Sequence, residues 1–218
     1  MVKLELRELT FSYAPGRPPL FEKLDFYVEP QTCSLLATPS GSGKSTFFKL
    51  LCGLYPQFGG QITHGGIFLE DQPLEKIVPF ERAKRIGMLF QDPDKRFCMA
   101  TLDQQLTFVL ENLQLPAKQI TAQKQRILQE LELTSLKDRQ LPPLSGGQKQ
   151  HAALACVLAT ESEIILLDEP FANVDPTSKA KLLKLLLKLK NQGKTFIIAD
   201  HDPSGYQDLL DFAYRFNA

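Results

Sequence analysis

The sequence predicts an α/β protein in which helices cover both faces of a parallel sheet. In the second half of the chain, helices and strands alternate in strict order: helix Gln148–Ala159, strand Ile164–Leu167, helix Lys179–Lys190 and strand Thr195–Ala199. Both strands are apolar throughout, which is typical of strands buried on the two faces of a parallel sheet. A glycine-rich loop between an apolar strand and a helix, in the first half, belongs to the same architecture.

The N-terminal part of the chain favours antiparallel strands beside that sheet. Val2–Arg7 alternates apolar and charged residues, as a half-buried strand does, and Phe11 and Tyr13 continue the pattern. The Pro- and Gly-rich segment 14–19 then turns the chain toward a second strand. The other elements expected here are strand Leu24–Val28, strand Ser34–Ala37, helix Lys44–Leu51, a hairpin over Gln61–Leu69 that turns at Gly65–Gly66, and strand Ile86–Phe90.

The middle of the chain is predicted to be helical. Residues 100–141 have helical periodicity and almost no strand signal, and Thr121 is expected to cap a helix over Ala122–Leu133. A chain of 218 residues suits one domain. We therefore predict a single domain, in which residues 1–92 and 146–218 form the sheet core with its antiparallel part and residues 93–145 form an inserted helical lobe.

Composition narrows the classes of function. Lys and Arg number 25, as do Asp and Glu, and no basic or acidic tail is present, so we expect no nucleic-acid partner. The four cysteines are far apart and form no C-x-x-C pair, which favours reduced cytosolic thiols over a disulfide framework or a metal site. No signal-peptide pattern and no run of about 18 apolar residues is present, so we expect a chain that is soluble by itself.

The stretch TPSGSGKST, residues 38–46, resembles the phosphate-binding pattern G-x-x-x-x-G-K-[ST] except that Thr38 replaces its first glycine. Glycines let backbone N–H groups converge on phosphate oxygens next to a helix start, where the dipole favours anions. Lys44 would reach the β- and γ-phosphates, and the Ser45 hydroxyl would bind Mg²⁺. We expect Thr38 to leave this cradle intact. The candidate nucleotide-binding residues of the stretch are Ser40, Gly41, Ser42, Gly43, Lys44, Ser45 and Thr46.

Two carboxylates follow the buried strand Ile164–Leu167. Open parallel sheets place their ligands at the carboxyl ends of the strands, which is where Asp168 and Glu169 lie. Asp168 is suited to holding Mg²⁺ through water, and Glu169 to polarising the water that attacks a γ-phosphate. Capping of the next helix is the alternative, and the upstream phosphate-binding pattern argues against it.

A second glycine pair opens the helix at residue 148. Ser145 and Gln148 fit a capping box, S-x-x-Q. That box does not explain Gly146 and Gly147, since each glycine costs a helix about 1 kcal/mol relative to alanine. A phosphate that approaches the bare helix start would explain them. Two such anion sites for one nucleotide make sense if each serves a different copy of the chain.

LSGGQ at residues 144–148, together with TPSGSGKST and ILLDEP in this order, resembles the ATP-binding-cassette (ABC) ATPases over essentially the whole chain. In that family two cassettes pair head-to-tail, with ATP between the P-loop of one and the signature of the other. The resemblance implies a P-loop NTPase fold with a RecA-like parallel-sheet core, an N-terminal antiparallel β subdomain and an inserted helical subdomain. It also implies ATP and Mg²⁺ as cofactors, and a second ABC ATPase subunit, identical or a paralogue, as partner.

Further residues match the family's motifs one by one. Tyr13 matches the aromatic residue that stacks on adenine, and Gln91 the glutamine that contacts Mg²⁺ and senses the membrane partner. Asp175 matches the aspartate at the dimer seam, and His201 the histidine near the γ-phosphate. The resemblance thus implies catalytic roles for Glu169, His201 and Gln91. It also implies that the partner's nucleotide site is completed by Ser145, Gly146, Gly147 and Gln148.

Within the family, Phe90–Asp94 followed by Ala100–Leu102 and Leu110–Asn112 is similar to the ATPases of energy-coupling factor (ECF) and cobalt/nickel-type importers. Those systems import vitamins or transition-metal ions through an integral membrane coupling subunit. The expected function is therefore ATP hydrolysis that drives import, by a peripheral subunit at the cytoplasmic face of the cell membrane.

The chain departs from the family pattern at three further positions, and other functions stay open. Arg96 and His151 stand where Gln and Arg are expected, and Asp200 where Thr or Ser is usual. The alternatives are a non-transport ABC ATPase, a regulatory cassette with weak hydrolysis because of Thr38, and a P-loop GTPase or kinase. A P-loop GTPase or kinase would not explain the LSGGQ segment, and the N-K-x-D segment that reads guanine is absent from the sequence.

Overall fold

The computed structural model describes residues 3–37, 41–91, 97–172 and 174–214. Their strands are β1 Leu4–Ser12, β2 Phe21–Val28, β3 Cys33–Leu36, β4 Gln61–Leu69, β5 Gln72–Pro73, β6 Ile86–Leu89, β7 Ile164–Asp168, β8 Thr195–Ala199 and β9 Phe212–Tyr214. Their helices are α1 Lys44–Leu51, α2 Pro79–Arg85, α3 Leu102–Asn112, α4 Ala117–Glu130, α5 Gly146–Ala159 and α6 Pro176–Asn191, with 3-10 turns η1 Leu74–Lys76 and η2 Thr134–Leu136.

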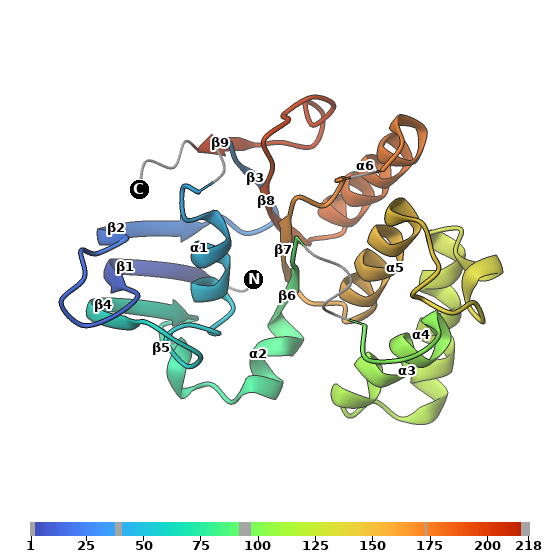
Figure 1. Cartoon of the computed structure of the whole chain (residues 1–218), viewed down its shortest axis with the longest axis horizontal. Helices are drawn as coiled ribbons and strands as arrows, with labels where there is room; N and C mark the ends of the chain where they lie inside the picture. Colours follow the sequence, from blue (N-terminus) through green and yellow to red (C-terminus); the bar gives the residue numbers. More distant parts are fainter. Residues whose placement is uncertain (1–2, 38–40, 92–96, 173, 215–218) are drawn as a thin grey trace.

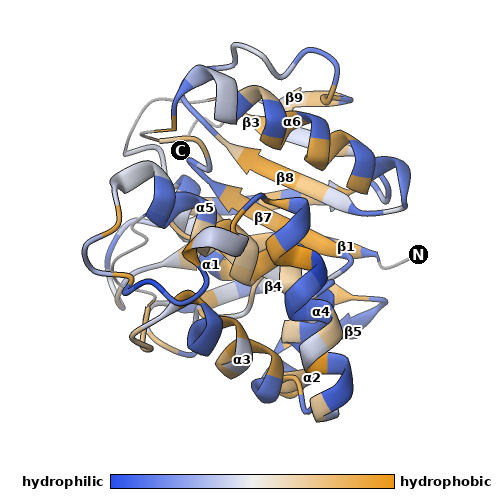
Figure 2. Ribbon diagram, turned by 90° about the vertical axis from the view of Figure 1, so that its right-hand side faces the viewer, coloured by the Kyte–Doolittle hydropathy of each residue, from blue (hydrophilic) through white to orange (hydrophobic). Residues whose placement is uncertain are grey.

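The predicted parallel sheet is confirmed. Its strand order is β6-β7-β8-β3-β9, and every neighbouring pair is parallel. Along β7, Ile164 and Leu166 pack into one apolar core, whereas Ile165 and Leu167 pack into the other. Both faces of the strand are therefore buried, which explains its continuous apolar sequence. Figure 2 shows β7 and β8 in the hydrophobic colour.

The two cores separate the molecule into two sides. Helix α1 and the antiparallel strands cover one face of the parallel sheet, and helices α3, α4, α5 and α6 cover the other (Figure 1). The side chains of α1 that enter the first core include Phe47, Phe48, Leu50 and Leu51. On the other side, α3, α4 and α5 contact one another around a leucine-rich cluster. The chain between β6 and α5 thus supplies α3 and α4.

The antiparallel sheet has the order β2-β1-β4-β5. The predicted hairpin within Gln61–Leu69 is wrong, because β4 runs unbroken through these residues and pairs with β1 from Leu4↔Leu69 to Ser12↔Gln61. The turn comes later, at Glu70–Asp71, where the chain reverses into β5. Gly65 is not part of a turn. It allows β4 to approach the backbone of β1 closely, because a Cβ there would clash with the carbonyl oxygen of Arg7.

The predicted cap at Thr121 is also wrong. Helix α4 begins at Ala117, after Pro116, and ends at Glu130. Thr121 lies within the helix, and its hydroxyl donates a hydrogen bond of 3.1 Å to the carbonyl of Ala117. A threonine inside a helix makes this bond to the preceding turn, so its capping preference is not used.

Among the described residues, no helix has both the length and the apolar content needed to cross a bilayer.

Candidate functional site

The start of α1 lies next to the end of β7. Gly43 directly precedes α1, Lys44 is its first residue, and the Lys44 side chain is largely buried. The Ser45 hydroxyl donates a hydrogen bond of 2.7 Å to Oδ2 of Asp168. Asp168 ends β7 and is only 3% exposed. Two of the three side chains predicted to bind Mg²⁺, Ser45 and Asp168, are therefore in contact.

Gln91 and Glu169 meet at the same edge of the sheet. Strands β6 and β7 run parallel and in register to Leu89↔Leu167, so the residues that follow them emerge side by side. Gln91 donates a hydrogen bond from Nε2 to Oε2 of Glu169, at 2.9 Å. The backbone of Glu169 has a φ of +49°, a rare conformation for a residue with a side chain. Such backbone is found at functional sites, where neighbouring groups hold it in place.

Backbone contacts explain how the conformation of Glu169 is held. Its N–H donates to the carbonyl of Ala199 at 2.8 Å. Its carbonyl accepts a hydrogen bond of 3.1 Å from Nε2 of Gln150, a side chain of α5 that is 2% exposed. Sequence reasoning missed Gln150. The available signal was a glutamine on the apolar, buried face of a helix, since a buried amide needs a partner.

The turn after β8 places His201 beside these carboxylates. His201 Nδ1 lies 4.0 Å from Oε1 of Glu169 and 3.6 Å from Oδ1 of Asp200, and the imidazole side chain is 67% exposed. Asp200 is buried, and its Oδ2 accepts a hydrogen bond of 2.6 Å from the Tyr206 hydroxyl. The carboxylate of Asp200 is thus fixed by a buried tyrosine, and its Oδ1 accepts a hydrogen bond of 3.0 Å from the Asp202 N–H across the turn that carries His201.

Tyr13 lies beside the start of α1. Its hydroxyl and Oγ1 of Thr46 are 2.5 Å apart, and the tyrosine remains 54% exposed. The ring makes edge contacts with Phe11 and Tyr55, which hold it in place. An exposed ring fixed next to a phosphate-binding loop can stack on a nucleotide base.

The signature segment forms the predicted capping box at the start of α5. The Ser145 hydroxyl accepts from the Gln148 N–H at 3.3 Å, and the Gln148 side chain accepts from the Ser145 N–H at 3.0 Å. Gly146 and Gly147 form the first turn. Helices α1 and α5 cover opposite faces of the parallel sheet (Figure 1), so the two glycine-rich helix starts belong to different sides of the molecule.

Asp175 caps α6 and lies close to α5. Its carboxylate accepts a hydrogen bond of 3.0 Å from the Ser178 N–H. Hydrogen bonding to the Ser178 side chain, and then to this N–H, lowers the pKa of Asp175. On α5, burial lowers the pKa of His151, and the charge of Asp175 acts in the opposite direction. Within the described part of the chain, Nε2 of His151 is buried without a hydrogen-bond partner.

Two predicted features of the phosphate-binding loop, Thr38 and Ser40, lie outside the described residues. The effect of Thr38 on the loop therefore stays a prediction.

The fold and these contacts define a nucleoside-triphosphatase of the P-loop class. A sequence model of the ABC transporter family matches residues 21–172. The chain belongs to the ATP-binding domains of that family, which bind ATP and are ATPases that drive transport. This confirms the predicted fold class and the resemblance seen in the sequence motifs.

Several relatives carry transporter names. The chain is 32% identical over 215 residues to the energy-coupling factor transporter ATP-binding protein EcfA of Carboxydothermus hydrogenoformans, covering 99% of this chain and 77% of that protein. It is 39% identical over 200 residues to the putative HMP/thiamine import ATP-binding protein YkoD of Bacillus subtilis. That match covers 91% of this chain but only 37% of YkoD, so the chain spans little more than a third of that relative.

Solved structures agree with this assignment. The structure of cbiO1 from Clostridium perfringens, described as part of the ABC transporter complex cbiONQ, superposes with a TM-score of 0.77 at 30% identity, covering 91% of this chain and 78% of that one. A nucleotide-free ATP-binding cassette from an ABC transporter gives a TM-score of 0.80 at 25% identity, covering 99% and 88%.

Proposed function

We propose that the chain is the ATP-hydrolysing subunit of an ECF-type importer that takes up a vitamin or a transition-metal ion. The observation that carries the hydrolytic part is the meeting of two pairs, Ser45 with Asp168 and Gln91 with Glu169, at one edge of the sheet. The importer part rests on relatives named as ECF ATPases and on cbiO1.

ATP would bind between the start of α1 and Tyr13. The first-turn N–H groups of α1 and the ammonium group of Lys44 are suited to the phosphates, and the exposed ring of Tyr13 to the adenine. Thr46 would hold Tyr13 in position through the 2.5 Å contact between their hydroxyls.

The residues present fit Mg²⁺. The Ser45 hydroxyl and the Asp168 carboxylate are hard oxygen ligands from two adjoining segments, and Gln91 adds an amide oxygen nearby. Bound there, Mg²⁺ would supply positive charge against the negative charge of the transferring phosphate. This chain's own part is to hold the hydroxyl of Ser45 and the carboxylate of Asp168 together.

Glu169 would be the catalytic base. Its carboxylate is held by the amide of Gln91, so it is oriented before substrate arrives. It would accept a proton from the attacking water, and His201, 4.0 Å from Oε1, would bind the γ-phosphate. The contacts of Gln150 and Ala199 with the Glu169 backbone support this geometry.

A second cassette, identical or paralogous, would complete the site. Helix α5 starts at Gly146 on the side of the sheet opposite to α1, so its open N-terminus is suited to a phosphate held by another chain. Asp175, which caps α6 close to α5, would lie at the seam between the two copies.

An integral membrane subunit would dock between the lobes, with the chain peripheral at the cytoplasmic face. A cavity of about 620 Å³ separates α2 and β6 from α3 and α5. Its lining residues are mostly apolar: Ala83, Ile86, Gly87, Met88, Phe90, Phe97, Gln105, Val109, Ala153, Cys156, Val157 and Thr160. Phe90 lines this groove and directly precedes Gln91. A shift of Gln91, which is hydrogen-bonded to Glu169, would therefore move the wall against which a docked helix packs.

Glu169→Gln tests the catalytic assignment. It keeps the size of the side chain but removes the base, so ATP binding should remain while turnover falls by about 10² to 10⁴-fold. The measurement is ATP hydrolysis by the complex with its membrane partners, together with chromatography to detect a trapped ATP-bound dimer. Glu163→Gln, at an exposed glutamate ahead of β7, is the matched control and should hydrolyse normally. Full activity of Glu169→Gln would remove the role assigned to Glu169.

Co-purification separates transport from the alternatives. If the chain purifies from membranes with an integral membrane subunit, the importer proposal is supported, and identification of the co-purified binding subunit names the cargo class. A non-transport ABC ATPase would show no such partner. A regulatory cassette would bind the membrane partners but hydrolyse no ATP in the complex.

A further inference from the structure

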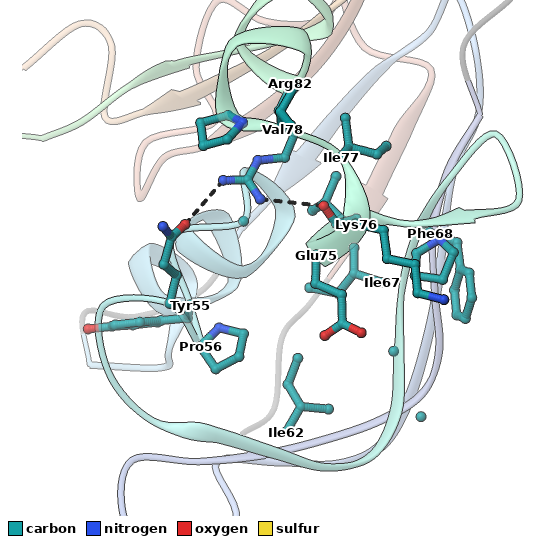
Figure 3. A pocket seen from close by; sticks show the side chains of 17 residues that line it. Tyr55, Pro56, Ile62, Ile67, Phe68, Glu75, Lys76, Ile77, Val78 and Arg82 are labelled. Atoms are coloured by element: carbon teal, nitrogen blue, oxygen red, sulfur yellow. Dashed lines mark hydrogen bonds between the residues drawn. The ribbon is translucent and has the colours of Figure 1, made fainter.

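A second cavity lies between the antiparallel sheet and α2. It has a volume of about 660 Å³ and shares no lining residue with the groove between the lobes. Strand β4, the turn η1, helix α2 and the loop after α1 surround it (Figure 3). This volume lies within the range of small-molecule sites in proteins.

A buried arginine forms one wall of the cavity. Arg82 of α2 is 8% exposed, and two dashed lines in Figure 3 mark the hydrogen bonds of its guanidinium. Nη1 donates to the Leu74 carbonyl at 3.4 Å and Nη2 to Oε1 of Gln57 at 3.3 Å. Both bonds are long and both acceptors are neutral. A guanidinium has five N–H donors, so most of its hydrogen-bonding capacity is not used by these two contacts.

No carboxylate of the described residues lies within 4.0 Å of the Arg82 guanidinium, whereas Arg7, Arg85 and Arg126 each form an ion pair. Arg85, one turn further along α2, forms an ion pair with Glu70, and Arg7 with Glu5 and Asp71. Buried charges in proteins are normally paired, because removing a charge from water is unfavourable. A buried cation that faces a cavity therefore indicates an anion as the missing partner.

The backbone makes room for this guanidinium. A Cβ at Gly53, whose φ is +72°, would lie 2.8 Å from both Cζ and Nη1 of Arg82. The glycine therefore lets the guanidinium lie against the chain just after the end of α1. The negative end of the α1 dipole offsets part of the charge there. Two of the last α1 carbonyls, those of Lys49 and Leu50, already accept hydrogen bonds from N–H groups of residues 53–55.

The other walls are mostly apolar. The residues that face the cavity beside Arg82 include Tyr55, Pro56, Ile62, Ile67, Phe68, Leu74, Ile77 and Val78. Glu75 and Lys76 also contribute to the lining, but both are exposed to solvent and their charges are opposite in sign. Mostly apolar walls with one buried, fixed cation suit a ligand that has an apolar body and one anionic group.

We propose that this cavity binds a small organic anion, a carboxylate or phosphate group carried on an aromatic or branched apolar body, with the Arg82 guanidinium as its charged partner. A planar guanidinium matches either group through two parallel N–H···O bonds. The site lies outside the proposed nucleotide site, so it would be occupied with or without ATP.

Ligand titrations followed by NMR test this inference on the full chain without nucleotide. Benzoate and phenyl phosphate are the probes, and inorganic phosphate is the probe without an apolar body. We expect benzoate and phenyl phosphate to shift the resonances of β4 and α2 with dissociation constants on the order of millimolar, as small ligands allow. Inorganic phosphate should bind there at least tenfold more weakly.

Two variants make the test decisive. Arg82→Gln should weaken benzoate binding at least tenfold, whereas Arg85→Gln, which removes one charge from the same helix outside the cavity, should leave it unchanged. Ile62→Phe narrows the cavity while keeping Arg82, so it should weaken binding even if Arg82→Gln fails to fold. Equal benzoate affinity in the wild type and in a folded Arg82→Gln, or no shifts in the wild type, would overturn the proposal. If inorganic phosphate binds as tightly as benzoate, the proposal that the ligand needs an apolar body is overturned.

Discussion

The amide of Gln91 and the carboxylate of Glu169 are joined by a hydrogen bond of 2.9 Å between residues that follow two adjacent parallel strands. Gln91 also follows Phe90, which lines the groove between the lobes. One side chain thus connects the proposed catalytic base with the proposed docking surface.

Gln91→Ala should break the connection between the proposed catalytic base, Glu169, and the groove between the lobes. A hydrogen bond to a charged group contributes about 1.5–3 kcal/mol, so its loss in the reacting state should lower turnover by about tenfold to a hundredfold. Nucleotide affinity should change little, because the contacts of Lys44 and Tyr13 remain. The measurement is kcat and KM for ATP in the membrane complex. Gln129→Ala, at an exposed position of α4, is the control. Unchanged kcat in Gln91→Ala would show that the bond has no part in turnover.

Ser45→Ala should destabilise the protein even without nucleotide. The Ser45 hydroxyl donates to a carboxylate that is 3% exposed, and loss of that donor should lower the free energy of unfolding by about 1.5–3 kcal/mol. Urea unfolding in the presence of a chelator measures this without any metal contribution. Ser45→Thr keeps the hydroxyl and should restore most of the loss. If alanine and threonine prove equally stable, the bond between Ser45 and Asp168 contributes nothing to folding.

The elements that were predicted correctly are those in which the pattern of apolar residues alone shows which side chains are buried. Four apolar residues followed by Asp168 and Glu169 predict a strand that ends in a ligand-binding edge, and the two-sided burial of β7 explains why. The residues predicted poorly depend on a distant partner. Gly65 resembles a turn residue until β1 is placed against it, and Gln150 bonds a carbonyl 19 positions away. The functional roles of the site residues stay predictions.

Gly147→Ala should affect stability and function in opposite directions. Alanine is favoured over glycine by up to about 1 kcal/mol in a helix, so the variant should be the more stable monomer. If the first turn of α5 receives a phosphate from another chain, the added methyl group should weaken ATP-dependent dimer formation. Urea unfolding and light scattering with ATP measure the two effects.

Ser145→Ala is the variant with which the stability of Gly147→Ala is compared. It removes the capping bond from the Gln148 N–H, so stability should fall by about 1 kcal/mol. A Gly147→Ala protein that is both more stable and better at forming the ATP-bound dimer would contradict a phosphate-binding role for the glycine pair.

His151 should make stability depend on pH. Burial lowers its pKa from the usual value of 6.5, so the unfolded chain binds a proton at this position more readily than the folded chain does. Stability contributed by the neutral imidazole is present above about pH 6.5 and is lost as the pH falls toward the folded-state pKa. The neighbouring charge of Asp175 reduces the shift without reversing it.

His151→Asn removes the titrating group and should flatten this dependence. Urea midpoints of the wild type and the variant, compared at several pH values between about 7.5 and 5.5, isolate the contribution of His151 from that of all other groups, which are common to both proteins. The wild type should lose stability relative to the variant as the pH falls, because only its side chain must be protonated in a buried position. A difference that is constant with pH, or that favours the wild type at low pH, would mean that His151 is as easily protonated in the folded chain as in the unfolded one.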